Sequence, residues 1–417
     1  MSATKDRLLA LETGVPTLGP ETVHIDITNS CNTNCVTCWD HSPHLALART
    51  AAWKRQRQDL GGVTALLDDI GGISGLGVPT GLRALILSGM GDPLTHPDAL
   101  TMIRDAKARG LHVTVITNLL AADADALLAS GVDELLIGIH AASEAAYLAF
   151  HPSFRPADWL KLHAMLARFR EAGRRFKHVH VICRHNAHEL PAMIVQASRL
   201  AASQVNFKLA SLHSGTEVAA ITDEQREALL TDAIAEAREL AGALGVPHNL
   251  DVFEAQLQAG GAATADIAEV GCFVGTAYSR ILVDGTVLYC CNTDVVVGRL
   301  GPETSFSALW TGPAWTALRA RLRRGEYFES CRQCGKFNQN VKWSEGFRRR
   351  FGEARWRVVT GRPAVTEGTA TGATVTEGTA TGATVTEGTA TGATVTEGTA
   401  TGATATEGSA RGITVTP

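Results

Sequence analysis

Three cysteines near the start of the chain have a spacing that suits metal chemistry. Cys31, Cys35 and Cys38 are separated by three and then by two residues, and they follow an apolar, β-branched run at Val23–Thr28. Thiolates are soft ligands that suit iron–sulfur clusters. Three of them leave one iron of a [4Fe–4S] cluster open, whereas a structural zinc ion is expected to have four protein ligands. The spacing therefore favours a cluster with an open iron, and a zinc site is the alternative.

These cysteines resemble the signature of the radical S-adenosylmethionine (SAM) superfamily, which is C-x3-C-x2-C with an aromatic residue beside the last cysteine, here Trp39. The resemblance extends over about residues 20–215 and includes a glycine-rich motif that meets the SAM amino group in the family. The residues of this motif are Gly89, Met90, Gly91 and Asp92, with Asp92 in place of the usual Glu. Glycine at such a position lets the backbone approach a ligand closely.

The same resemblance implies contacts with SAM at the ends of the third and fourth apolar runs. The residues there are Thr117, Asn118, Gly138 and His140. The fifth run ends in Cys183, Arg184, His185 and Asn186, where polar groups commonly touch cofactor or substrate. Each of these residues is equally compatible with a polar strand end that hydrogen-bonds its own loop. Cys183 is interpreted as a small buried apolar residue and not as a ligand.

A second group of cysteines lies in the C-terminal half of the chain. Its spacing resembles the SPASM/Twitch extension of many radical SAM enzymes, and no cysteine follows Cys334, so the shorter Twitch form is the closer match. The resemblance implies that one auxiliary [4Fe–4S] cluster is held by Cys272, Cys290, Cys331 and Cys334. Cys291 competes with Cys290, and the spacing from Gly285 favours Cys290. A four-cysteine zinc site is the chemical alternative.

The resemblance implies three cofactors: a [4Fe–4S] cluster with an open iron, SAM, and the auxiliary cluster. One electron would cleave SAM, and the resulting 5′-deoxyadenosyl radical would abstract hydrogen from a substrate carbon. A fully ligated auxiliary cluster suits electron transfer, so we expect a two-electron oxidation or the modification of a natural product or peptide. The expected partners are SAM, a small-molecule or peptide substrate and an external flavodoxin- or ferredoxin-type electron donor. An iron–sulfur electron-transfer or binding protein without radical chemistry is the alternative.

Proton transfer at the substrate would need a nearby base or cation. The candidates for this role are Asp40, His41, Arg184 and His185. The first two come just after the first cysteine set, where they face the substrate or simply fold the loop.

Composition narrows the class of protein. The chain has 417 residues, of which 45% are apolar and 19% charged, and its formal net charge is −4. This balance does not indicate nucleic acid or an anionic membrane as a partner. No signal peptide or membrane-spanning run is recognised, so we expect a cytoplasmic protein whose cysteines stay reduced.

The elements that position these residues alternate between strand and helix. Six apolar runs are expected to be strands, at Val23–Thr28, Ala84–Ser88, Val113–Asn118, Glu134–His140, His178–Arg184 and Val205–Leu209. Helical spacing between most of them predicts parallel β/α units. The expected fold is α/β, with a partial (β/α)6 TIM-like barrel or a doubly wound sheet. In both, chemistry collects at the carboxyl ends of the strands.

We expect the chain to divide into six parts. They are a lead-in at 1–20, a radical SAM core at 21–215, a helical connector at 216–265, a small α+β Twitch-type domain at 266–345, a basic segment at 346–362 and decapeptide repeats at 363–417. A hairpin is expected at Ser279–Tyr289, turning at Asp284 and Gly285. The repeats are rich in Thr and Gly and lack aromatic residues, so a disordered tail is predicted.

Overall fold

The computed structural model describes residues 18–73, 81–261 and 263–360, and within the repeats residues 371–377, 383–391 and 403–404. The first 17 residues of the expected lead-in lie outside this part of the chain. Two compact units are present, Met1–Gly361 and Arg362–Pro417. Among the described residues, no helix has the length and apolar character needed to cross a membrane.

Six parallel strands form the first part of the larger unit, and all six were expected from the sequence. They are β1 Thr22–Asp26, β2 Ala84–Ser88, β3 His112–Thr117, β4 Glu134–Gly138, β5 Lys177–Ile182 and β6 Gln204–Leu209. Each pairs with the next in chain order, without the reversal of strand order that defines a doubly wound sheet. The arrangement is therefore the partial (β/α)6 barrel.

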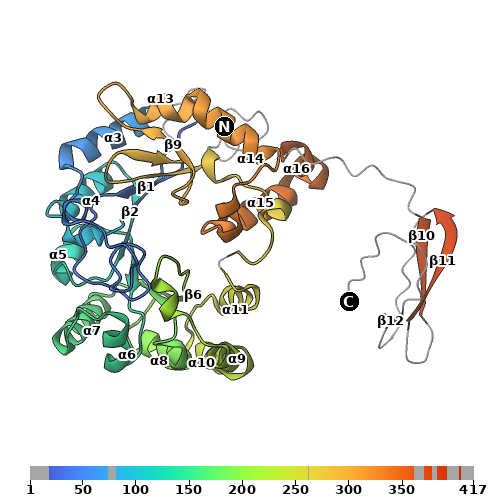
Figure 1. Ribbon diagram of the computed structural model, residues 1–417, viewed down its shortest axis with the longest axis horizontal. Coiled ribbons are helices and arrows are strands. Elements are labelled where there is room, and N and C mark those ends of the chain that lie inside the picture. The colour runs from blue at the N-terminus through green and yellow to red at the C-terminus, as the bar shows by residue number, and fades with distance from the viewer. Residues whose placement is uncertain are drawn as a thin grey trace. The chain divides into compact units, whose positions relative to one another are not determined.

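Helices follow the strands and cover their outer side, as Figure 1 shows. They are α3 Leu60–Gly72, α4 Ala99–Ala108, α5 Ala124–Ala129, α6 Glu144–Phe150, α7 Pro156–Glu171 and α8 Leu190–Arg199. Side-chain oxygens of Asp59, Asp123 and Ser143 accept hydrogen bonds from first-turn N–H groups, which fixes where α3, α5 and α6 begin.

Side chains alternate across the barrel strands. In β1, Val23 and Ile25 are fully buried against the covering helices. His24 and Asp26 lie on the opposite side, because successive side chains of a strand point to opposite faces. We call this opposite side the inner face. In β1, apolar side chains thus face the helices and polar side chains face the inside of the barrel.

The expected connector is helical. It contains η3 Thr216–Ala219, α9 Asp223–Ala228, the π-helical turn η4 Leu229–Ala233, α10 Ile234–Leu244 and α11 Leu250–Ala259. Leu229, Ile234 and Phe253 pack in one cluster with buried residues of α8 and β6. The connector thus closes the last barrel unit.

The hairpin predicted at Ser279–Tyr289 is present as β7 Tyr278–Ile281 and β8 Thr286–Leu288, and β9 Val296–Arg299 follows. Gly285 adopts φ +84°, the left-handed conformation that its turn requires. The sheet order is β6-β5-β4-β3-β2-β1-β7-β8-β9, because β7 pairs in parallel with the free side of β1. The cysteine-bearing hairpin therefore continues the barrel sheet, and the separate domain boundaries drawn from the sequence stay a prediction.

Helices complete the C-terminal half of this unit. They include α12 Ile267–Val270, α13 Phe306–Thr311, α14 Pro313–Arg323, η6 Glu329–Gln333, α15 Phe337–Phe351 and α16 Glu353–Val359. Trp310 and Trp315 are fully buried in the same hydrophobic cluster as the barrel residues. The basic segment expected at 346–362 lies mostly in α15 and α16, and its Trp356 packs on Phe273. This segment is part of the folded unit.

The repeats contain described strands in the second unit. They are β10 Thr371–Glu377, β11 Ala383–Thr391 and β12 Ala403–Thr404. β10 and β11 pair antiparallel, with Val375 opposite Val385, and β12 pairs in parallel with β11. The rest of the repeats lies outside the described residues, where the expected disorder stays a prediction.

Candidate active site

Cys31, Cys35 and Cys38 lie on the loop that leaves the carboxyl end of β1. All three are half-buried and none forms a disulfide. Burial, and secondarily the charge of Asp92, raises the pKa of Cys31 to about 12. Burial also raises the pKa of Cys35, with the other two cysteines adding to the effect. The thiols are therefore close enough to influence one another.

The surroundings of these sulfur atoms suit an iron–sulfur cluster. Backbone N–H groups of Asp40, His41 and Ser42 hydrogen-bond to Cys38, and those of Thr33 and Asp92 hydrogen-bond to Cys31. Hydrogen bonds to cysteine sulfurs are among the interactions that tune such clusters. Three thiols with N–H donors around them therefore fit a [4Fe–4S] cluster with one open iron.

The glycine-rich loop after β2 rests directly on the cysteine loop. Asp92 N donates to Ser30 O over 2.8 Å. A Cβ atom on Gly91 would lie 2.0 Å from Ser30 O, and one on Gly89 would lie 2.5 Å from Thr28 O. Both glycines are thus required by the close approach of two backbone segments. From the sequence, we expected these glycines to let the backbone approach a ligand. The contact between the two loops is a second reason why glycine is needed at both positions.

Asp92 connects the predicted SAM-binding strand ends. Its carboxylate accepts hydrogen bonds from Thr117 Oγ1 at 2.9 and 2.8 Å and from Asn118 N at 2.7 Å. Leu94 N donates to the same carboxylate at 2.9 Å. Asn118 Nδ2 in turn donates to Asn32 Oδ1 of the cysteine loop at 2.7 Å. The three predicted residues therefore form one network with the cysteine loop.

Gly138 and His140 lie together at the end of β4. His140 has φ +62°, and its Nδ1 accepts a hydrogen bond from Val181 N at 3.0 Å. Its ring stacks on Phe150 at 4.4 Å. A Cβ on Gly138 would lie 2.6 Å from His140 Nε2, so the glycine makes room for this ring. Burial lowers the pKa of His140 well below its usual value, which keeps the imidazole neutral.

Trp39, the aromatic residue beside Cys38, reaches across to the loop after β6. Its Nε1 donates to Ser211 O at 2.6 Å, and its ring lies 4.5 Å from the ring of His213. The cysteine loop, which follows β1, therefore also contacts the loop that follows β6, so it touches the first and the last strand of the partial barrel.

The candidate proton-transfer residues differ in how they are engaged. Asp40 is bound by Arg49, with Nε at 2.8 Å and Nη2 at 2.7 Å from Oδ1. His41 is buried beside the backbone of Asn29 and Met90, and its Nε2 has no hydrogen-bond partner. His41 is thus the candidate whose side chain keeps a ring nitrogen, Nε2, without a hydrogen-bond partner.

Arg184 and His185 lie apart from this group, on the loop after β5. Arg184 is exposed, and its Nη1 donates to Val218 O at 3.1 Å. Burial, followed by the charges of Arg184 and His44, lowers the pKa of His185. Cys183 is fully buried, as expected of an apolar residue.

The second cysteine set also comes together. Burial raises the pKa of Cys272 well above its usual value, and the further causes are Cys290, Cys334 and Cys331 in that order. Backbone hydrogen bonds reach the sulfurs of Cys290 from Asn292 and of Cys334 from Lys336. Burial raises the pKa of Cys290 to about 12 and of Cys334 to about 11. The predicted four thiols are therefore neighbours.

Cys291 lies beside this group and faces other residues as well. Its Sγ would be 3.3 Å from a Cβ on Gly335, and it interacts electrostatically with Cys331 and Cys334. It does not appear among the groups that act on Cys272, whereas Cys290 does. Cys331 and Cys334, by contrast, are acted on by Cys291 and not by Cys290. The choice of Cys290 over Cys291 therefore stays a prediction from the sequence. Among the residues that the structure describes, no three His, Cys, Asp or Glu side chains could hold a single metal ion.

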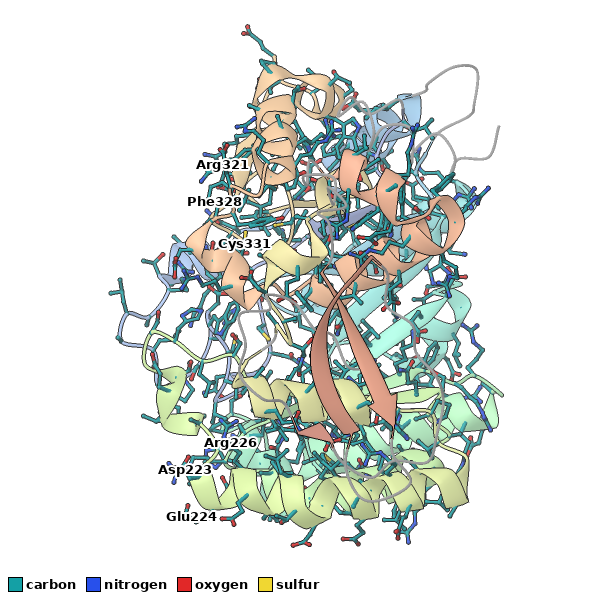
Figure 2. The ribbon with its side chains drawn as sticks, turned by 90° about the vertical axis from the view of Figure 1, so that its right-hand side faces the viewer. Asp223, Glu224, Arg226, Arg321, Phe328 and Cys331 are labelled. Atoms are coloured by element: carbon teal, nitrogen blue, oxygen red, sulfur yellow. The ribbon has the colours of Figure 1, made fainter. Side chains whose placement is uncertain are left out.

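One edge of the second set approaches the surface at Cys331, which is half-buried. Figure 2 shows Arg321, Phe328 and Cys331 close together on one side of the molecule. Arg321 Cζ lies 3.9 Å from the centroid of the Phe328 ring, and its charge lowers the pKa of Cys331 in opposition to burial.

The sequence reasoning missed a polar network on the inner face that joins the two halves of the sheet. Arg280 of β7 donates to both carboxylate oxygens of Asp26, at 3.1 and 2.7 Å. His24 Nδ1 lies 2.9 Å from Tyr278 Oη, and its Nε2 lies 2.7 Å from Ser88 Oγ. The sequence did offer one sign of this network, because His24 and Asp26 are polar residues at alternate positions of the otherwise apolar strand β1.

Two family matches cover these two sites. Residues 25–196 match the radical SAM superfamily, and residues 272–335 match the SPASM iron–sulfur cluster-binding domain. The chain belongs to the radical SAM superfamily and is an enzyme with a SPASM-type domain. Its cofactors are accordingly SAM, a [4Fe–4S] cluster and auxiliary iron–sulfur. The zinc alternatives have no support in these matches.

A curated relative and two solved structures extend the comparison. AdoMet-dependent heme synthase of Methanosarcina barkeri is 25% identical over 309 residues, which cover 70% of this chain and 83% of the relative. SuiB of Streptococcus suis, solved with the precursor peptide SuiA, matches with a TM-score of 0.53 at 14% identity, over 80% of this chain and 73% of SuiB. Native anSMEcpe with bound AdoMet matches with a TM-score of 0.52 at 11% identity, over 82% and 99%. The structural matches establish the shared fold.

Proposed function

We propose that this enzyme cleaves SAM reductively and uses the 5′-deoxyadenosyl radical to oxidise a carbon centre of its substrate by two electrons. The observation that carries the proposal is the network in which Asp92 joins Thr117 and Asn118, which in turn contacts the cysteine loop through Asn32. This network places the glycine-rich loop, the end of β3 and the three thiols at one end of the barrel. That is the end at which such folds carry their chemistry.

Each group of residues has its own task in this proposal. Cys31, Cys35 and Cys38 would hold the first cluster, and Cys272, Cys290, Cys331 and Cys334 would hold the second. When bound, the first cluster supplies the electron that cleaves SAM, and the second accepts the electron that the substrate radical releases together with a proton.

His41 is the residue we favour for receiving that proton. It is buried, it lies next to the cysteine loop, and its Nε2 has no partner. Asp40 is less suitable because Arg49 binds its carboxylate, and Arg184 and His185 are placed on a different loop. The choice of His41 among these four candidates rests on their positions in the structure.

Relatives bear on the substrate through their names. One is a heme synthase, and SuiB was solved with a precursor peptide, so both a small molecule and a peptide have precedents in the fold. A flavodoxin- or ferredoxin-type protein is the donor we expect.

The test is anaerobic. Protein with reconstituted clusters, dithionite and SAM should produce 5′-deoxyadenosine and methionine, measured by liquid chromatography. An electron-transfer or binding protein without radical chemistry would retain its clusters but leave SAM intact, and that result would replace this proposal by the alternative.

A further inference from the structure

One buried arginine in the C-terminal half carries a positive charge that no carboxylate offsets. Arg319 lies on α14, and only 5% of it is exposed. Burial lowers the pKa of Arg319 to about 10, which leaves the guanidinium group charged at neutral pH. Within the described part of the chain, no salt bridge reaches this group. Because arginine is almost never fully buried unless it is paired, its charge calls for a partner.

The contacts of Arg319 hold the guanidinium group in place without neutralising it. Nε donates to Gly275 O at 3.1 Å, and Nη1 donates to Trp310 O at 3.0 Å. Cζ lies 4.6 Å from the ring centroid of Trp310 and 5.3 Å from that of Trp315. Nη2 is buried and has no hydrogen-bond partner. Carbonyl oxygens and aromatic faces attract a cation but carry no net charge, so the positive charge is fixed and uncompensated.

Arg280 shows what compensation looks like elsewhere in the same unit. Its side chain is 15% exposed, and its Nη2 lies 2.7 Å from Asp26 Oδ2. A buried cation of this kind has its counter-charge within the chain. The described residues offer Arg319 no such carboxylate, which leaves a bound anionic group as the source of compensation.

Arg319 lies beside the second cysteine set. Gly275, whose carbonyl oxygen binds Arg319, follows Cys272 in the chain, and a Cβ on Gly275 would lie 2.0 Å from Tyr289 Cζ. Tyr289 directly precedes Cys290. Cys272, Tyr289 and Arg319 together line a small cavity of about 30 Å³. The uncompensated charge is therefore close to the part of the chain that we predict to hold the auxiliary cluster.

The helix that carries Arg319 also approaches another predicted ligand. Arg321 of α14 lies close to Phe328 and Cys331, as Figure 2 shows. Its charge lowers the pKa of Cys331 in opposition to burial. Arg321 is only half-buried, whereas Arg319 is shielded from water. A charge acts more strongly where water does not screen it, so Arg319 is the arginine with the greater expected influence.

We propose that Arg319 supplies the fixed counter-charge of the auxiliary iron–sulfur cluster and raises its reduction potential. Four thiolates give a [4Fe–4S] cluster a net negative charge, which grows when an electron is added. A positive charge held nearby therefore stabilises the reduced form more than the oxidised form.

This inference rests on the proposed function, since it assumes that the second cysteine set holds a cluster. It deepens that function by naming a residue that makes the cluster a better electron acceptor. Arg319 acts through the cluster and not on the substrate, so it is a positioning residue.

The test measures the reduction potential of the auxiliary cluster alone. Replacing Cys31, Cys35 and Cys38 by Ala removes the first cluster, and the full chain with this background is reconstituted anaerobically. Dithionite titration with redox mediators is followed by electron paramagnetic resonance. We expect Arg319→Gln to lower the ratio of reduced to oxidised cluster at a given potential at least about tenfold, which is about 59 mV for one electron.

Arg324→Gln is the matched control. Arg324 caps the end of the same helix, but it is exposed and paired with Glu326, so water screens its charge. The potential of this variant should equal that of the background.

A second variant keeps the charge and makes it titratable. The potential of Arg319→Lys should fall as the pH rises, because a buried ammonium group loses its proton whereas a guanidinium group stays charged. The background should lack this additional pH dependence. A merely structural Arg319 would give no pH-dependent difference between the two proteins.

Two sets of outcomes separate this proposal from the proposed function. Equal potentials in the background and in Arg319→Gln would overturn the role of Arg319. If Arg319→Gln binds no iron, Arg319→Lys decides, and a pH dependence equal to that of the background overturns the role. Absence of iron from the background itself would overturn both the ligand assignment and this proposal. SAM left intact by the unchanged chain with both clusters present would overturn the proposed function alone.

Discussion

Thr117 Oγ1 lies 2.9 and 2.8 Å from the two carboxylate oxygens of Asp92, and this contact links the glycine-rich loop to the end of β3. The carboxylate is fully engaged, because the N–H groups of Leu94 and Asn118 bind it as well. Burial raises the pKa of Asp92, and these hydrogen bonds oppose that effect. Asp92 therefore acts as a brace that holds the glycine-rich loop against the end of β3, the two segments that we predict to contact SAM.

Asp92→Asn should destabilise the protein. An amide places an N–H₂ group where the carboxylate accepts, so at least one buried donor loses its partner at a cost of about 1–3 kcal/mol. Urea unfolding followed by circular dichroism measures this loss, and SAM affinity should fall with it. Thr117→Ser keeps the hydroxyl and should retain most of the stability. Asp98→Asn is the control, since Asp98 makes no capping hydrogen bond to α4. Equal stability of Asp92→Asn and Asp98→Asn would contradict the role of a brace.

Replacing Cys31, Cys35 and Cys38 together by Ala should remove one of two clusters. The reconstituted protein should hold about eight irons and the triple variant about half of them, because each [4Fe–4S] cluster contributes four. Iron analysis measures this, and SAM cleavage should be abolished. Cys183→Ala is the control, because Cys183 is fully buried and is interpreted as an apolar residue. Continued SAM cleavage by the triple variant would contradict the assignment.

Cys290→Ala and Cys291→Ala separate the two candidate ligands of the auxiliary cluster. We expect Cys290→Ala to lose iron, to keep forming 5′-deoxyadenosine and to yield little oxidised product, since reductive cleavage needs only the first cluster. Cys291→Ala should match the unchanged protein in iron content. Equal iron loss in both variants, or loss confined to Cys291→Ala, would reverse the ligand assignment. Full turnover by Cys290→Ala would end the electron-acceptor role.

Buried histidines of β5 should make stability depend on pH. Burial lowers the pKa of both His178 and His180 to about 3. Neither of the two ring nitrogens of His180 has a hydrogen-bond partner. The folded chain keeps these rings neutral, whereas the unfolded chain takes up protons below a pKa of about 6.5. Stability should therefore be level above about pH 7 and fall between about pH 6.5 and pH 3, by up to about 1.4 kcal/mol per pH unit and histidine.

Urea unfolding at a series of pH values measures this dependence. His178→Gln and His180→Gln should each flatten it, because each removes one proton-binding site from the unfolded chain. His188→Gln, at an exposed position, should leave the dependence unchanged. Other buried histidines, among them His140, contribute to the same pH window, so each variant should reduce the slope without abolishing it. A slope equal to that of the unchanged protein in both β5 variants would contradict the prediction.

A chain that ends at Gly361 should fold and cleave SAM like the full chain. The larger unit ends at this residue and contains both cysteine sets and the hydrophobic cluster that joins them. Size-exclusion chromatography, iron content and 5′-deoxyadenosine formation are the measurements. Aggregation or cluster loss in the shortened chain would show that the repeats stabilise the folded unit.

The sequence was sufficient for the parts of the fold that are local. Alternating apolar runs predicted six strands to within two residues at each end, and Asp284 with Gly285 predicted the hairpin turn. These features depend on neighbours in the chain and on side-chain alternation. The spacing of Cys31, Cys35 and Cys38 is local information of the same kind, since the three residues lie in one loop. The second set runs from Cys272 to Cys334, and its four ligands were implied by the family resemblance and not by local spacing.

Long-range pairings could not be predicted in this way. The ion pair of Asp26 with Arg280 joins residues 254 positions apart, and nothing in either segment specifies the other. Asp92 was predicted to meet SAM, and its engagement with Thr117 became visible only once both loops were placed.

The parallel pairing of β7 with β1 has a mechanical consequence. β1 is hydrogen-bonded to β2 on one side and to β7 on the other, so both cysteine sets are attached to one continuous ladder of backbone bonds. A hinge between them would have to break that ladder. The electron path between the two cysteine sets should therefore keep a nearly constant length during turnover, and substrate must enter and leave by movement of loops and side chains.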